Sequence, residues 1–140
     1  MNQRGFATLE VILMVMVIGI LASIAVPRFT SVTAAANTAK IQADLSTIDT
    51  AVAIYRMEYG EDKEPTISDL VSKGYLQAEP KVPSGSAYMQ KGNATTATVQ
   101  SFSSTAKYDI TYEGDSAPKV AKPTFDELTA DKFYIPKKTS

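Results

Sequence analysis

The sequence contains no cysteine and no histidine. Without cysteine it offers neither disulfide bonds nor thiolate metal ligands, and it gives no indication of a redox compartment. Without histidine it lacks the commonest catalytic base, and Ser-His and Cys-His nucleophile arrangements are excluded. Only carboxylates, lysine and tyrosine remain for catalysis, and no pair of carboxylates can be distinguished as a general acid and base. The composition therefore argues against an enzyme.

The chain also carries little net charge. Its formal charge is -1 at pH 7, and no basic cluster follows the apolar run near the N-terminus. The sequence therefore has no electrostatic basis for binding nucleic acid through a basic patch. With 140 residues, 44% of them hydrophobic, it is long enough for one compact domain. We expect one globular unit and an N-terminal tail.

A long apolar run extends from Val11 to Val26, interrupted only by Gly19 and Ser23. Extended back to Phe6, which adds only Thr8 and Glu10 as polar residues, the run has about 20 residues, and in a helix these match the hydrocarbon core of a bilayer, which is about 30 Å thick. Glu10 stands at the head of this run, although a charge at the centre of a spanning helix costs about 2.5–3.5 kcal/mol. The sequence predicts a membrane helix in which this carboxylate needs an explanation.

Two simple interpretations leave Glu10 without a role. In the first, Arg4 and the small residues SIA before Val26 form a secretory signal peptide. In the second, the run is a plain anchor for an extracytoplasmic domain. Either one would make the protein a monomeric binding module, secreted or held at the membrane.

A third interpretation uses the order of the residues. The residues Gly5, Phe6 and Glu10, with the basic leader MNQRG before them and a long apolar helix after them, resemble the type IV prepilin signature. The resemblance implies that a prepilin peptidase cuts between Gly5 and Phe6 and that Phe6 is then N-methylated. It also implies a single-pass subunit in the cytoplasmic membrane before assembly and a cell-surface or extracellular filament after it.

The resemblance gives Glu10 a physical role. A free α-amino group has a pKa of about 7.7–8.0 and is positive at neutral pH. If the amine of Phe6 on a neighbouring subunit approaches Glu10, it offsets the desolvation penalty of the buried carboxylate. Glu10 and Phe6 are thus the predicted assembly residues of a homopolymer, whose other partners are the peptidase-methyltransferase and the membrane assembly machinery.

Two residues are expected to weaken the long helix. Pro27 removes a backbone donor and should kink the helix, and Gly19 is a poor helix former that can also permit close packing. In the family that the signature resembles, a Gly and a Pro at these positions flank a locally unwound stretch. A helix that is only kinked at Pro27 remains the alternative. The predicted parts are a cleaved leader at residues 1–5, a membrane and filament-core helix at 6–27 and a head at 28–140.

The helix should continue to Tyr59 and become amphipathic, with Gly60 ending it. An apolar stripe at helical spacing predicts the face that packs under the head. Its members are Phe29, Val32, Ala36, Ala39, Ile41, Leu45, Ile48, Val52, Tyr55 and Tyr59. The polar residues opposite, such as Gln42, Asp44 and Arg56, suit solvent or a neighbouring subunit.

The head is predicted to hold a short helix and a small sheet. The stretch PTISDLVSKGYL predicts a helix with Thr66 as cap and Gly74 as terminator. The strand candidates SAYMQ, ATTATVQSF and AKYDITYEG are joined by connections short enough for hairpins, KGN and SST. Thr124 and Glu127 show a capping-box pattern in the tail, which predicts one more helical turn or a loop closing over the sheet. The expected fold class is α+β, with the hydrophobic half of the helix protruding from an antiparallel head.

The run LVSKGYLQAEPKVPSGSAY resembles major pseudopilins of type II secretion systems and Gram-positive type IV pilins, but it has Ser84 where many secretion pseudopilins carry tryptophan. The predicted function is therefore a structural subunit of a type IV pilus or pilus-like filament. The alternative is a pseudopilin of a secretion or DNA-uptake system.

We expect no cofactor. Asp109, Glu113 and Asp115 are weak calcium candidates, because calcium prefers six to eight oxygen ligands and these residues match no loop template.

Overall fold

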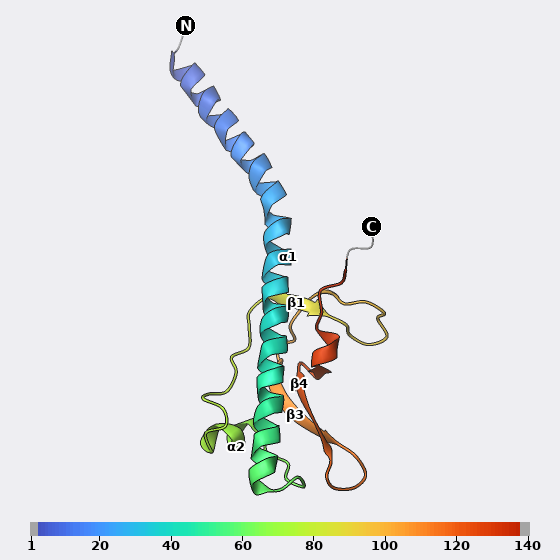
Figure 1. Cartoon of the computed structure of the whole chain (residues 1–140). Helices are drawn as coiled ribbons and strands as arrows, with labels where there is room; N and C mark the ends of the chain where they lie inside the picture. The colour runs from blue at the N-terminus through green and yellow to red at the C-terminus, as the bar shows by residue number, and fades with distance from the viewer. Residues whose placement is uncertain (1–2, 138–140) are drawn as a thin grey trace. The chain divides into compact units, whose positions relative to one another are not determined.

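The computed structural model describes residues 3–137, except for the side chains of residues 25–28. By internal contacts the chain divides into two compact units, Met1–Val32 and Thr33–Ser140, which we call the N-terminal segment and the head. The predicted α+β class, a long N-terminal helix followed by a small antiparallel sheet domain, is confirmed. The elements in chain order are α1 (Gln3–Tyr59), α2 (Ile67–Ser72), β1 (Ser86–Met89), β2 (Thr98–Ser101), β3 (Tyr108–Glu113), β4 (Val120–Phe125), β5 (Leu128–Thr129) and the 3-10 helix η1 (Ala130–Lys132). Figure 1 labels α1, α2, β1, β3 and β4.

Helix α1 ends at Tyr59, directly before Gly60, as the sequence predicts. Gly60 has a φ of +114°, and its N–H donates to the carbonyl of Arg56 at 2.9 Å. Because side chains disfavour this left-handed backbone, glycine ends the helix directly after Tyr59. The predicted end is confirmed.

The helical range of α1 includes both Gly19 and Pro27. A side chain at Gly19 would meet nothing within 4 Å, so no packing inside this chain requires a glycine there. The side chain of Pro27 lies outside the described part. The kink at Pro27, the weak stretch after Gly19 and the predicted part boundaries at 5/6 and 27/28 stay predictions.

The buried stripe of α1 agrees with the prediction only from Ile41 to Val52, because the predicted Tyr55 is half-buried and Tyr59 is 44% exposed. Ile41, Leu45, Ile48 and Val52 are at most 2% exposed. Before Ile41, the predicted Phe29, Val32, Ala36 and Ala39 are all exposed, and the buried positions are instead Ala34 and Thr38. The prediction was wrong here because alanines occur on several faces of this turn and apolar periodicity does not choose among them.

Helix α2 forms as its capping signals predict. The Thr66 hydroxyl accepts the Asp69 N–H at 3.2 Å, and the Asp69 carboxylate accepts the Thr66 N–H at 2.9 Å. This reciprocal capping box satisfies backbone donors that a helix leaves unpaired. Hydrogen bonds from the Thr66 hydroxyl and N–H hold the pKa of Asp69 below its usual range. Gly74, with a φ of +84°, follows the last turn as predicted.

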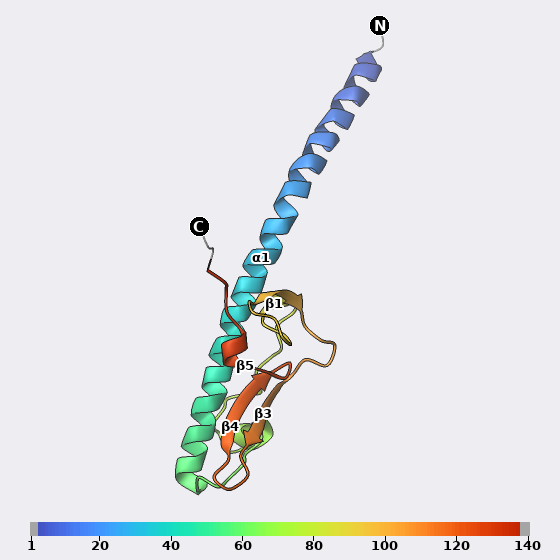
Figure 2. The same ribbon diagram turned by 90° about the vertical axis from the view of Figure 1, so that its right-hand side faces the viewer.

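The three predicted strands exist, but they are divided between two antiparallel sheets. β1 pairs with β2, and β3 belongs to a second sheet in the order β3-β4-β5. Figure 2 shows the second sheet beside the part of α1 that belongs to the head. The predicted hairpin through SST is wrong because the chain leaves β2 there, and Phe102 packs against the core of the head.

Strands β4 and β5 were not predicted, because β4 contains Pro123 and proline has no N–H for a ladder. Pro123 is tolerated because β5 pairs only with Thr124 and Phe125, which leaves the edge of β4 open beside the proline. The capping box of Thr124 with Glu127 is wrong, since Thr124 lies in β4 and Glu127 in the β4–β5 turn. A short helical turn does form, three residues later, as η1.

The core of the head joins both sheets to α1 and α2. Phe125 is fully buried at its centre, with ring centroids of Phe102, Tyr108 and Phe133 at 5.3, 4.7 and 6.0 Å. Phe133 comes from the C-terminal tail, so this tail closes over the core, as one of the two predicted arrangements requires. The remaining core residues include Ile41, Leu45, Ile48, Val52, Ile67, Leu70, Ala87, Met89 and Ile110.

Candidate functional site

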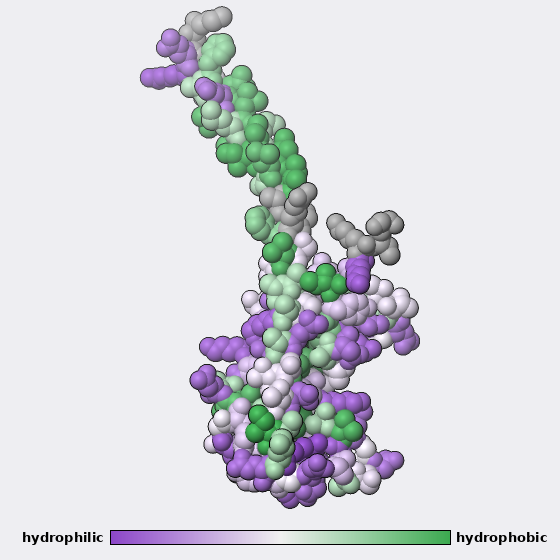
Figure 3. All heavy atoms as spheres, in the orientation of Figure 1, coloured by the Kyte–Doolittle hydropathy of each residue, from purple (hydrophilic) through white to green (hydrophobic). Residues whose placement is uncertain are grey.

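The N-terminal segment has an apolar surface with no cover. All described side chains from residue 3 to residue 24 are exposed, and large ones such as Phe6 and Ile12 are 65% and 51% exposed. The described residues include one helix long and apolar enough to cross a membrane, with a mean hydropathy of 2.7 in its most apolar window and none of that window buried. In Figure 3 hydrophobic atoms dominate this segment, whereas the head surface is mixed. So large an apolar surface indicates contact with a membrane or another protein.

Glu10 lies on this apolar surface. It borders an open depression of about 390 Å³ whose other lining residues, Leu13, Met14, Val17 and Ile18, are all apolar. Among the ion pairs of the described residues, none involves Glu10. A carboxylate in apolar surroundings without an internal partner requires a cation from outside the chain if the surface is buried.

Gly5 and Phe6 are consecutive residues of α1, in its first two turns. A side chain at Gly5 would meet nothing within 4 Å, so no contact inside this chain requires a glycine there. Cleavage and N-methylation at this bond stay predictions.

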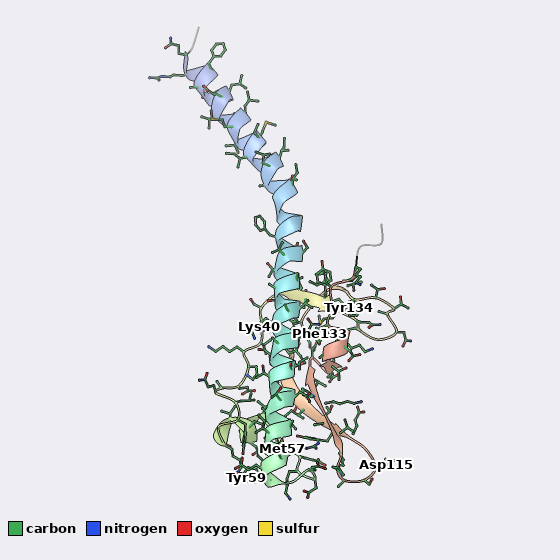
Figure 4. All side chains as sticks on the ribbon, viewed as in Figure 1. Lys40, Met57, Tyr59, Asp115, Phe133 and Tyr134 are labelled. Atoms are coloured by element: carbon green, nitrogen blue, oxygen red, sulfur yellow. The ribbon has the colours of Figure 1, made fainter. Side chains whose placement is uncertain are left out.

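The three calcium candidates are not assembled into a site. Asp109 pairs with Lys107 at 2.9 Å, Glu113 pairs with Lys122, and Asp115 lies in the β3–β4 connection (Figure 4). The hydrogen bond from Lys107 also holds the pKa of the Asp109 carboxyl below its usual range. In the part of the chain that the structure describes, no group of three acidic, histidine or cysteine residues could hold a metal. Calcium binding therefore stays a prediction without geometric support.

Two polar residues of α1 that the sequence did not single out hold the β1–β2 sheet. The Asn37 amide donates to the carbonyls of Ser84 and Ser86 at 2.9 and 2.8 Å. The Thr38 hydroxyl accepts the Tyr88 N–H at 2.8 Å and donates to the Ala34 carbonyl at 2.7 Å. Asparagine and threonine within a helix usually face solvent, so nothing in the local pattern identifies these contacts.

Polar residues on the predicted outer face of α1 also bind within the head. Gln42 donates to the Phe133 carbonyl at 2.5 Å, and Asp44 accepts the Tyr108 hydroxyl at 2.5 Å. Burial and this carboxylate raise the pKa of Tyr108 well above its ordinary value. Tyr112 donates to the Pro65 carbonyl at 2.5 Å, and burial raises its pKa to about 12. The Gln42 and Asp44 contacts fasten the tail and β3 to α1, and the Tyr112 contact fastens β3 to the α1–α2 connection, so these side chains serve the head itself.

Comparison with known proteins agrees with this arrangement. The chain is 32% identical over 96 residues to the type IV narrow pilus major component PilA5 of Thermus thermophilus, covering 69% of this chain and 78% of that protein. The chain belongs to the type IV pilin and pseudopilin family. Two further members of this family are 28% identical: the ComG operon protein 3 homolog of Bacillus licheniformis, over 62% of this chain and 89% of that protein, and the type II secretion system core protein G of Pectobacterium carotovorum, over 64% and 59%.

No family model matches this pilin-family chain, and no solved structure matches it. Its assignment to the family therefore depends on these relatives and on the fold. In this chain, the residues of the prepilin signature, Gly5, Phe6 and Glu10, all lie in the exposed N-terminal part of α1. The buried contacts described above lie in the head.

Proposed function

We propose that this chain is a structural subunit of a pilus or pseudopilus filament. Its N-terminal segment spans the cytoplasmic membrane before assembly and lies in the helical core of the filament afterwards. A prepilin peptidase removes residues 1–5 and Phe6 is methylated on its new amine. Identical subunits then bundle through this segment and present the head on the cell surface.

The observation that carries this proposal is the unpaired carboxylate of Glu10 on an apolar, exposed helix face. In a lipid or helix-bundle environment such a charge is disfavoured by about 2.5–3.5 kcal/mol even on lenient scales. A cationic amine from Phe6 of an adjacent subunit would offset that penalty and would favour one axial position. The same carboxylate therefore opposes isolated subunits and favours the filament.

A second candidate is a pseudopilin of a type II secretion or DNA-uptake system. Four relatives support it, since they are named as core protein G of type II secretion systems. Helix bundling with a Glu10 charge pair would assemble either filament. The two candidates therefore differ in the assembly machinery and not in the chemistry of this chain. A monomeric membrane-anchored binding module has less support, because it gives Glu10 no partner.

The proposal is tested by changing Glu10 in the native host. Glu10→Gln keeps the size and removes the charge, so membrane insertion and processing should survive while filament assembly slows or fails. Glu10→Lys should be worse, because it places like charges together in a low-dielectric bundle. Sheared filaments are counted by electron microscopy, and intact mass reports loss of residues 1–5 and one added methyl group.

Glu10→Asp is the matched control, since it keeps the charge and should retain more assembly than Glu10→Gln. A processed Glu10→Lys subunit that assembles at wild-type yield would contradict the charge-pair mechanism. A chain that keeps its leader, or is cut near Ala25, would instead support the anchor or signal-peptide interpretation.

A further inference from the structure

A groove on the head lies between α1 and the N-terminal part of β4. Its volume is about 470 Å³, and Val52, Ala53, Met57 and Val120 contribute apolar surface to it. Val52 is 2% exposed and lies at the bottom, whereas Met57 and Val120 are 86% and 61% exposed. Uncovered apolar side chains around a depression are typical of a protein-binding surface.

The charged residues around this groove leave one net negative charge. Lys119 pairs with Glu64 at 3.1 Å, so these two charges cancel, whereas Arg56 donates to the neutral Lys63 carbonyl at 2.9 Å and keeps its positive charge. Asp49 and Glu61 also line the groove, and neither forms an ion pair with another described residue. A partner that places a lysine or arginine beside an apolar side chain would match this groove.

This chain carries such a segment itself. In Tyr134–Lys137, Ile135 is 54% exposed and Lys137 is exposed. The segment is anchored, because the Phe133 ring is buried and the Tyr134 hydroxyl accepts the Ala97 N–H at 3.1 Å. Among the described lysines, Lys137 and Lys81 are the two with neither an ion pair nor a ring contact.

The groove and the segment lie at different ends of the head. Figure 4 places Met57 at the end of the head that holds Tyr59 and Asp115, and places Phe133 and Tyr134 toward the other end, near Lys40. A contact between two such surfaces is heterologous, so each copy that binds through its groove still has a free segment for the next copy. This geometry allows an open-ended row of heads.

We propose that the groove between α1 and β4 binds the Tyr134–Lys137 segment of a second copy of this chain. Ile135 occupies the apolar groove, and Lys137 faces Asp49 and Glu61. The inference rests on the proposed filament function and names the head contact that accompanies helix bundling. Burial of Ile135 in the apolar groove stabilises the contact, and the charge of Lys137 opposite Asp49 and Glu61 selects the register of the two heads.

The first test reverses charge in the full chain in its host. Lys137→Glu should lower the yield of sheared filaments about tenfold, since like charges then face each other in the contact. Adding Glu61→Lys to that variant should restore much of the yield. Lys81→Glu, at the other described lysine whose side chain has neither an ion pair nor a ring contact, is the matched control and should leave the yield unchanged. Equal yields from Lys137→Glu and wild type would overturn the proposal.

The second test uses the absence of natural cysteine. With Met57→Cys and Ile135→Cys in one chain, mild oxidation of filaments should give disulfide-linked ladders longer than dimers. The control pair, Met57→Cys with Val82→Cys, should give none beyond dimers, because Val82 is exposed but lies outside both surfaces. Filaments of normal appearance without ladders would overturn this contact and leave the proposed function standing. Failure of the wild-type chain to form any filament would overturn both.

Discussion

Thr38 is the buried polar residue by which α1 holds strand β1. It is 1% exposed, and its hydroxyl both donates to the Ala34 carbonyl and accepts the Tyr88 N–H. A threonine at this position completes the hydrogen bonding of a strand edge that has no neighbouring strand on that side. An apolar side chain of the same shape would pack equally well but would leave the N–H unpaired.

We therefore expect Thr38→Val to lower the free energy of unfolding by about 1–3 kcal/mol, the penalty of an unsatisfied buried donor. Thr38→Ser keeps the hydroxyl and should lose less. Thr47 offers a matched control, because its hydroxyl makes the same i to i-4 bond to Ala43 at an exposed position, so Thr47→Val should change stability by less than about 0.5 kcal/mol. Urea unfolding followed by circular dichroism measures all three, and equal effects of the two valine variants would contradict the role of Thr38.

The β4–β5 hairpin turns through two residues with positive φ, Asp126 at 49° and Glu127 at 65°. Two-residue turns of this kind favour glycine at the second position, because other residues are strained there. The Asp126 carboxylate pairs with Lys91 of the β1–β2 connection, whereas Glu127 is exposed. The turn thus contains one residue with a tertiary contact and one that tolerates replacement.

Glu127→Gly should stabilise the head by about 0.5–1 kcal/mol, because relief of strain exceeds the extra entropy of glycine in the unfolded chain. Glu127→Val should destabilise it, since a β-branched side chain is poorly accommodated at positive φ. Thermal unfolding of the two variants beside wild type is the measurement. A valine variant as stable as the glycine variant would show that this turn is not strained.

At the scale of the whole molecule, the two units divide the physical tasks. Among the described residues, the core cluster begins at Ile41, while the exposed apolar surface of the N-terminal segment precedes Thr33. Removing residues 1–28 should therefore delete the proposed membrane and bundling surface but keep the core. We expect a soluble, folded, monomeric head at low protein concentration.

Circular dichroism and sedimentation measure this outcome for the truncated chain. A further truncation that removes residues 1–44 is the matched control, because it deletes Thr38 and Ile41 and should not fold cooperatively. If the chain that lacks residues 1–28 were insoluble or unfolded, the division of α1 between the two units would be incorrect.

Several features of this protein followed from the sequence alone because their physical causes are local. The length and apolarity of the run after Glu10, the glycine that ends α1 and the Thr66–Asp69 capping box each act within a few residues. The residues that form β1 and β3 were identified for the same reason. The predicted assembly motif of Gly5, Phe6 and Glu10 also lies within one short stretch, so the order and spacing of its residues suffice to name them.

The tertiary structure alone decided which strands pair and which polar side chains are buried. β4 forms despite Pro123 because its pairing with β3 and the burial of Phe125 outweigh an unfavourable local signal. Thr38 is buried because β1 reaches α1 from 50 residues away in the sequence. The groove beside β4 likewise combines residues of α1 with the chain around Val120. Such features depend on contacts between distant segments, and neither periodicity nor capping signals describe those contacts.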